Sequence, residues 1–121
     1  MSSSDVFMLE ELRARLQNDE EIIRVILLHF VNDTPQQINE MQLAVASRNS
    51  ERVRILAHTL KGAAATVAGN ELSTLAASVE LASKADELEK ADAPIRELPF
   101  AFARFLEEVV RTGFYSGDVL T

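Results

Sequence analysis

One short segment carries side chains of the kinds that take part in group transfer. His58 stands in "LAHTLKGAAATVAGNEL", with Lys61 three residues later and Gly62 directly after that lysine. A neutral imidazole offers a lone pair at neutral pH and is therefore a candidate nucleophile. Residues three and four apart are neighbours on the surface of a helix, so these side chains would share one small patch.

Helical spacing places His58 away from the protein core. The segment from residue 51 to 67 is expected to form a helix whose apolar residues share one sector about 100° wide. His58 lies roughly 170° from the centre of that sector, so its ring should be exposed. The residues of the apolar sector are Val53, Leu56, Leu60, Ala63, Ala64 and Val67.

Small residues surround the histidine on this helix. Gly62 costs an interior helical position about 1 kcal/mol relative to alanine. Gly69 already supplies a helix stop, with Asn70 as a cap for the next helix, so Gly62 is not needed for either purpose. Gly62 and Ala65 therefore indicate a low surface that leaves room for a bulky partner beside His58.

The short turns on either side of this helix suggest neighbours for His58. If the following turn is centred near residue 69, residue 58 lies level with Glu80. If the preceding turn is centred near residue 49, residue 58 lies level with Glu40, with Gln37 and Met41 close by. A carboxylate that accepts a hydrogen bond from one ring nitrogen would fix the tautomer and leave the other nitrogen nucleophilic.

Two further residues of the same helix lie near this patch. Arg54, one turn before His58, is either a binding residue or a solvated residue whose aliphatic side-chain stem lies along the surface. Ile55 either forms part of an apolar docking patch or packs on the N-terminal segment. The second histidine, His29 in "ILLHFV", is expected to be an ordinary helix-edge residue.

The elements that position these residues are all predicted to be helices. We expect a short helix over residues 5–16, a long one from a cap at Asn18 or Asp19 to about 47, and one over 51–67. Two more are expected from 70 to about 87 and from Pro94 to about 112, with "EKADAP" as a polar connection. Pro35 either kinks the long helix or breaks it at "NDT"; because the apolar period resumes in phase, we favour the kink.

Four long helices joined by short turns should pack as antiparallel neighbours. The predicted fold class is all-α: an up-down antiparallel four-helix bundle with a short N-terminal helix. We expect one domain over residues 1–121, with an ordered core of about 5–112 and a tail at 113–121 of low order.

Composition narrows the class of protein. The 121 residues are 47% apolar and 26% charged, as in a soluble globular domain. Nineteen acidic residues against twelve basic ones give a formal charge of −7, which disfavours nucleic-acid binding. No apolar run approaches the ~20 residues of a membrane helix, and "MSSSDVFMLEEL" does not resemble a secretory signal. The absence of cysteine fits a reducing compartment and excludes thiolate chemistry.

The motif "AHTLKG", followed by a run of small residues, resembles the histidine phosphotransfer (HPt) domains of bacterial multistep phosphorelays. "HFVNDTP" and "LSTLAASVE" are similar to the preceding and following helices of that family, and the resemblance covers about residues 5–110. It implies a cytoplasmic phosphocarrier, expected to be a monomer, which exchanges a phosphoryl group with receiver domains. The sequence leaves open which receivers these are, and whether the domain stands alone or belongs to a hybrid kinase.

The resemblance also implies a role for each residue of the patch. His58 matches the phospho-accepting histidine, with Nε2 as the expected site. Lys61 matches the lysine that neutralises phosphoryl oxygens, and Gly62 the glycine that keeps the approach open. Glu80 stands where the family carries a polar residue, often glutamine, that orients the ring. An acid at this position is one departure from the family pattern. A second departure is in "TVAGN": the family's glycine usually stands one residue earlier, at Ala68.

The partner surface expected from these arguments comprises Arg54, Ile55, Ala65, Gln37 and Met41. No cofactor or metal is expected on the chain, and Mg²⁺ should belong to the receiver. No ATP-binding motif occurs, so the domain should not phosphorylate itself. The alternatives are a non-catalytic receiver-binding module and a metal-binding bundle. The second is disfavoured because neither histidine has glutamate three residues before it.

Overall fold

The computed structural model describes residues 6–114, and every regular element in that range is helical. No strand occurs among these residues, which confirms the all-α class. The elements are α2 (Leu9–Arg15), α3 (Glu20–Ala46), α4 (Ser50–Thr66), α5 (Asn70–Lys84), the 3-10 turn η1 (Leu88–Lys90) and α6 (Asp92–Thr112).

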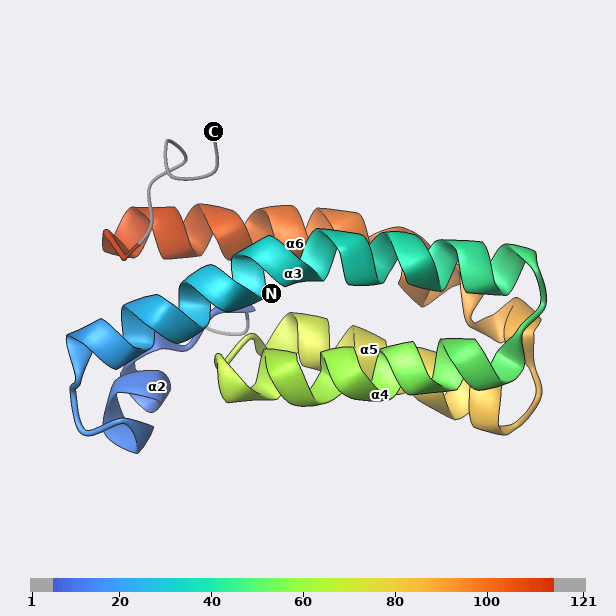
Figure 1. The fold of residues 1–121 in the computed structure, drawn as a ribbon, viewed down its shortest axis with the longest axis horizontal. Helices are drawn as coiled ribbons and strands as arrows, with labels where there is room; N and C mark the ends of the chain where they lie inside the picture. Colours follow the sequence, from blue (N-terminus) through green and yellow to red (C-terminus); the bar gives the residue numbers. More distant parts are fainter. Residues whose placement is uncertain (1–5, 115–121) are drawn as a thin grey trace.

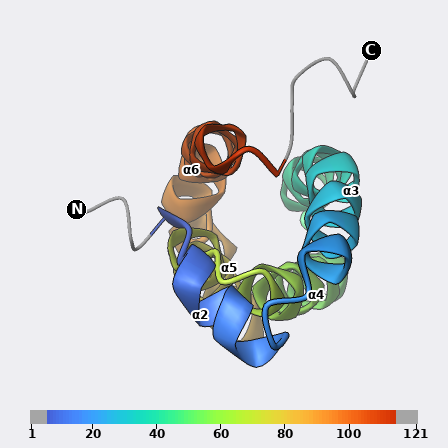
Figure 2. The same cartoon turned by 90° about the vertical axis from the view of Figure 1, so that its left-hand side faces the viewer.

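The four long helices lie side by side around a shared apolar interior. Helix α4 packs against α3 and α5, and α6 packs against α5 and α3. Successive long helices run in alternating directions in Figure 1, and Figure 2 shows them end-on with α6 diagonally across from α4. Each contributes fully buried side chains to the interior, among them Leu27, Leu60, Leu72 and Phe105.

Helix α2 lies at the end where α4 turns into α5. The backbone N–H of Met8 donates to the carbonyl of Ala68 at 3.0 Å, and Arg15 Nη1 donates to the carbonyl of Ala65 at 3.1 Å. Leu12 of α2 is buried against the core. These contacts attach α2 to the α4–α5 turn (Figure 2). The helix is shorter than expected, and α5 ends at Lys84 rather than near residue 87.

Helices α3 and α4 begin at side-chain caps that the sequence indicates. Asp19 accepts a hydrogen bond from the N–H of Ile22 at 3.1 Å, and Asn49 accepts one from the N–H of Arg52, also at 3.1 Å. Each satisfies an N–H that has no partner within its own helix. Pro35 lies inside α3, which continues from Glu20 to Ala46 as one helix, so the break at "NDT" does not occur.

The turn between α4 and α5 differs from the sequence expectation. Gly69 has an ordinary φ of −91°, and the left-handed residue that ends α4 is Ala68, with φ of +58°. Gly69 is instead closely packed: a Cβ at this position would lie 3.1 Å from Cε1 of Phe105, which is tighter than an ordinary contact. Asn70 does not cap α5: it is the first residue of that helix, and its amide donates to the sulfur of Met8.

The C-terminal part contributes more residues to the core than the sequence suggested. Leu88 and Ala91 are buried within the segment expected to be a polar connection, and α6 begins at Asp92, before Pro94. Phe114, assigned to the tail, is buried, and the guanidinium groups of Arg13 and Arg24 each lie 5.6 Å from its ring centroid. The rest of the expected tail, residues 115–121, lies outside the described residues.

Candidate functional site

His58 occupies the exposed face in the middle of α4. Its side chain is 65% exposed, whereas Leu60 and Ala64 on the opposite face are fully buried. The helical spacing therefore predicted the direction of this side chain correctly. An exposed imidazole can be reached by another molecule, so the ring is available for chemistry.

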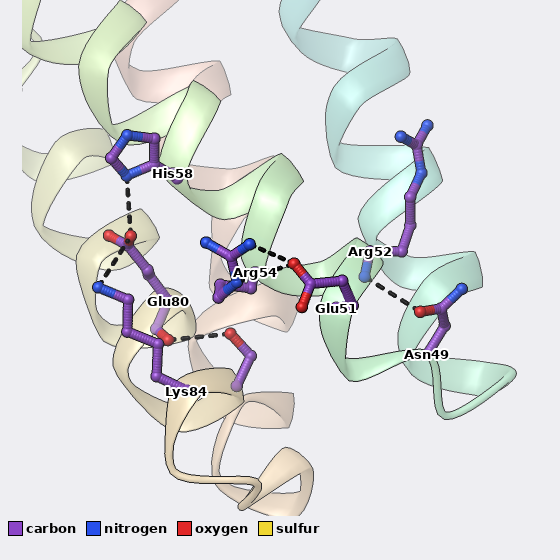
Figure 3. Close-up of polar contacts among 8 residues, drawn as sticks. Asn49, Glu51, Arg52, Arg54, His58, Glu80 and Lys84 are labelled. Atoms are coloured by element: carbon purple, nitrogen blue, oxygen red, sulfur yellow. Dashed lines mark hydrogen bonds and ion pairs between the residues drawn. The ribbon is translucent and has the colours of Figure 1, made fainter.

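A buried carboxylate on α5 holds the ring in place. Nδ1 of His58 lies 2.8 Å from Oε2 of Glu80, within hydrogen-bond distance. Glu80 is only 3% exposed, so its carboxylate is shielded from solvent. Figure 3 shows His58 reaching from α4 to Glu80 on α5, with the second ring nitrogen on the opposite side of the ring.

Two lysines share the Glu80 carboxylate with the histidine. Lys61 Nζ lies 2.7 Å from Oε1, and Lys84 Nζ lies 3.4 Å from Oε2. The hydrogen bond from Lys61 is the largest influence that lowers the pKa of Glu80 to about 2, and the hydrogen bond from His58 acts in the same direction. Burial acts in the opposite direction but is outweighed. Glu80 is therefore ionised at neutral pH.

The charge of Glu80 determines which ring nitrogen of His58 is free. An ionised carboxylate can only accept hydrogen bonds, so Nδ1 must carry a hydrogen and donate it to Oε2. In the neutral ring the lone pair then belongs to Nε2, which does not contact Glu80. The arrangement gives a nucleophilic nitrogen with a fixed direction.

Gly62 leaves an open surface beside the ring. It is exposed, and a Cβ built at this position meets no atom within 4 Å. The protein's own packing therefore does not require glycine here, whereas at Gly69 the ring of Phe105 leaves little room for a side chain. Ala65 is also exposed, and Ile55 on the same helix is 44% exposed. The face around His58 is low and partly apolar.

Arg54 lies on this helix but is held by its own neighbour. Its guanidinium forms an ion pair with Glu51 (Figure 3), and this hydrogen bond is the main cause that raises the pKa of Arg54 above its usual value. Sequence reasoning missed one further cation of the site, Lys84, although it stands four residues after Glu80 and is therefore its neighbour on α5.

The residues expected from α3 behave differently from one another. Gln37 lies with His29 and Thr66 in the lining of a groove of about 330 Å³ between α3 and α4. The buried Oε1 of Gln37 has no hydrogen-bond partner among the described residues. Met41 is 0% exposed, so its assignment to the partner surface is wrong. Glu40 lies 3.7 Å from Arg52 rather than beside His58.

Between residues 6 and 114, no group of three or more His, Asp or Glu side chains is placed to hold a metal ion. Over the same range, no helix has the length and apolar character needed to cross a membrane.

The fold and the site together define an all-helical domain that presents one exposed, oriented histidine. Comparison with protein families gives a match to the Hpt domain over residues 25–112, which extends from α3 to the end of α6 and includes His58, Lys61 and Glu80. The chain therefore belongs to the Hpt domain family, whose members act in histidine phosphotransfer within phosphorelays, without kinase activity. No similar curated protein and no similar solved structure was found.

Proposed function

We propose that His58 accepts a phosphoryl group from the phospho-aspartate of a receiver domain and passes it to the aspartate of another. The domain would act as an up-down four-helix bundle that presents this residue on α4. The observation that carries the proposal is the contact between Nδ1 of His58 and the buried carboxylate of Glu80, because it directs Nε2 outward as a nucleophile.

In the forward step, the lone pair of Nε2 attacks phosphorus in line with the bond to the aspartyl oxygen. A P–N bond forms as the P–O bond breaks, and the bonding pair leaves with the aspartate carboxylate. The ring becomes a cation that keeps its hydrogen on Nδ1, 2.8 Å from the Glu80 carboxylate. In the return step, another aspartate attacks phosphorus and the ring leaves as a neutral imidazole.

An acid at position 80 suits this change in ring charge. A carboxylate at this position also adds negative charge near an incoming phosphoryl group. The carboxylate is 3% exposed and faces Nδ1, on the side of the ring away from the phosphoryl group. It therefore lies closest to the positive charge that develops on the ring, and its electrostatic effect should favour transfer.

The cations of the site would act on the phosphoryl oxygens. Lys61 is 38% exposed and lies one helical turn from His58, so its ammonium group can reach from Glu80 towards a phosphoryl group at Nε2. Arg54 would contribute once its guanidinium group leaves Glu51 and binds the phosphoryl group or the partner. The Mg²⁺ ion of the reaction is expected on the partner receiver.

The partner would dock on the low face around His58. Gly62, Ala65 and Ile55 are exposed there, and Gln37 borders the adjoining groove. We assign this exchange to a monomer in the cytoplasm, since each chain carries its own complete site and the proposed partners are signalling proteins of that compartment. A non-catalytic receiver-binding module is the alternative, and an oriented nucleophile favours the carrier instead.

The test follows a labelled phosphoryl group from a charged cognate receiver to this protein. Wild type should acquire an acid-labile, base-stable label, and His58→Gln should acquire none. His29→Gln is the matched control, because His29 is also exposed but has no carboxylate partner among the described residues. Label on the His58→Gln variant would refute the assignment of His58. Binding without label on wild type would favour the interaction module.

A further inference from the structure

Glu80 has more cationic partners than ring orientation requires. One hydrogen bond from Nδ1 is enough to fix the ring, yet Lys61 lies on Oε1 and Lys84 lies near Oε2. Among residues 6–114, Glu80 is the only carboxylate within ion-pair distance of either lysine. Both ammonium groups are therefore committed to one buried charge.

Phosphoryl transfer would disturb this arrangement. Lys61 is the lysine expected to neutralise the phosphoryl oxygens, but in the structure its ammonium group lies 2.7 Å from Oε1 of Glu80. If it turns outward, Oε1 loses its partner while the carboxylate stays buried. A buried charge without compensation is strongly unfavourable, so this loss would oppose the movement of Lys61.

We propose that Lys84 is a positioning residue that compensates Glu80 when Lys61 moves to the phosphoryl group. This inference rests on the proposed function of His58. Lys84 lies four residues after Glu80 on α5 and is 55% exposed, so its side chain has room to shorten its present 3.4 Å separation from Oε2. Figure 3 shows Lys84 extending along α5 towards Glu80.

A purely structural role for Lys84 makes different predictions. Lys84 is the last residue of α5, where a cation also interacts favourably with the helix dipole. That interaction does not depend on Glu80, and it would change thermal stability without changing transfer. The proposed role requires Glu80 to be charged, and it therefore disappears when Glu80 is made neutral.

The first test is a double-mutant cycle on the rate of transfer from a charged receiver. Lys84→Ala should slow transfer by about threefold or more in the wild-type background, the range expected of directly coupled residues. Lys84→Arg should restore most of the rate. In the Glu80→Gln background, Lys84→Ala should have no effect, because a neutral amide needs no compensating cation. Thermal melts of all variants control for folding.

Two results of the cycle would overturn the proposal. The first is an unchanged rate in Lys84→Ala. The second is an equal loss of rate in both backgrounds, which would assign Lys84 to direct contact with the partner. If wild type itself takes no label from any receiver, the proposed function fails. The role of Lys84 must then be tested by a measurement that needs no receiver.

The second test supplies that receiver-independent measurement. His58 is phosphorylated chemically with phosphoramidate, and NMR monitors hydrogen exchange of the two lysine ammonium groups. Phosphorylation should slow exchange at Lys84 as it closes on Glu80, and Glu80→Gln should remove the change. Exchange at Lys84 that is the same before and after phosphorylation would refute the compensation, whatever the receivers do.

Discussion

Replacing Gly62 with alanine should stabilise the fold and impair transfer. The added Cβ meets no atom within 4 Å, so the substitution should gain the full helix-propensity difference of about 1 kcal/mol. For 121 residues, an unfolding entropy of about 2.1 cal/mol/K per residue converts this gain to a rise in Tm of about 4 °C. Transfer should fall, because the methyl group stands where the partner must approach His58.

The size of the functional loss follows from the cost of an extra methyl group in a close-packed contact. That cost is typically about 1–3 kcal/mol, which corresponds to a reduction of about 5- to 150-fold in the transfer rate. The assay measures initial rates of label transfer from a charged receiver, alongside thermal unfolding followed by circular dichroism. Free phosphoramidate is small, so its reaction with His58 should be affected much less.

A matched control separates stability from access. Ala103 is exposed on α6, which packs against α5 and α3 rather than α4. Ala103→Gly should lose about 1 kcal/mol of stability and leave transfer unchanged. The double variant should melt near the wild-type temperature and still transfer slowly. Full transfer activity in the stabilised Gly62→Ala protein would refute the idea that this glycine leaves space for a partner.

Three further predictions concern stability. Arg48→Gly should raise the free energy of unfolding, measured in urea, by about 1 kcal/mol, because Arg48 is exposed and has a φ of +57°. Ala68→Gly should gain little, because it also removes a buried methyl group. Gly69→Ala should cost about 1–3 kcal/mol by pressing on Phe105. The pKa of Glu80 is about 2 in the folded protein, against an ordinary value of 4.5. Its contribution to the free energy of unfolding should therefore be present above pH 4.5 and be lost towards pH 2. Subtracting the acid unfolding curve of Glu80→Gln from that of wild type isolates this contribution, and parallel curves would contradict it.

The pairing of His58 with Glu80 could be predicted because the turn between their helices is short. Residues equally far from residue 69 on two antiparallel helices lie at the same level, and the structure places these two side chains 2.8 Å apart. The same argument failed for Met41, because a short turn predicts how far along the bundle a residue lies but not which face of its helix it occupies. Met41 lies one turn from Ile38 and from Ala44, both buried, and it faces the core with them.

Other features depend on contacts that no local pattern reveals. The little room at Gly69 comes from Phe105, far along the chain, and the left-handed φ of the preceding Ala68 is not indicated by its residue type. The burial of Glu80 depends on lysines from two helices whose ammonium groups converge on its carboxylate. Phe114 is buried beside Arg13 and Arg24, which belong to the other end of the sequence.

The most direct test of the account is to identify the phosphorylated atom. Protein with ¹⁵N-labelled histidine rings is charged by a cognate receiver and observed by NMR, with His29→Gln used to assign the His58 resonances. We predict phosphorus on Nε2 of His58 and a hydrogen retained on Nδ1, held by Glu80. Phosphorus on Nδ1, or on any residue other than His58, would contradict the proposed orientation of the ring by the buried carboxylate.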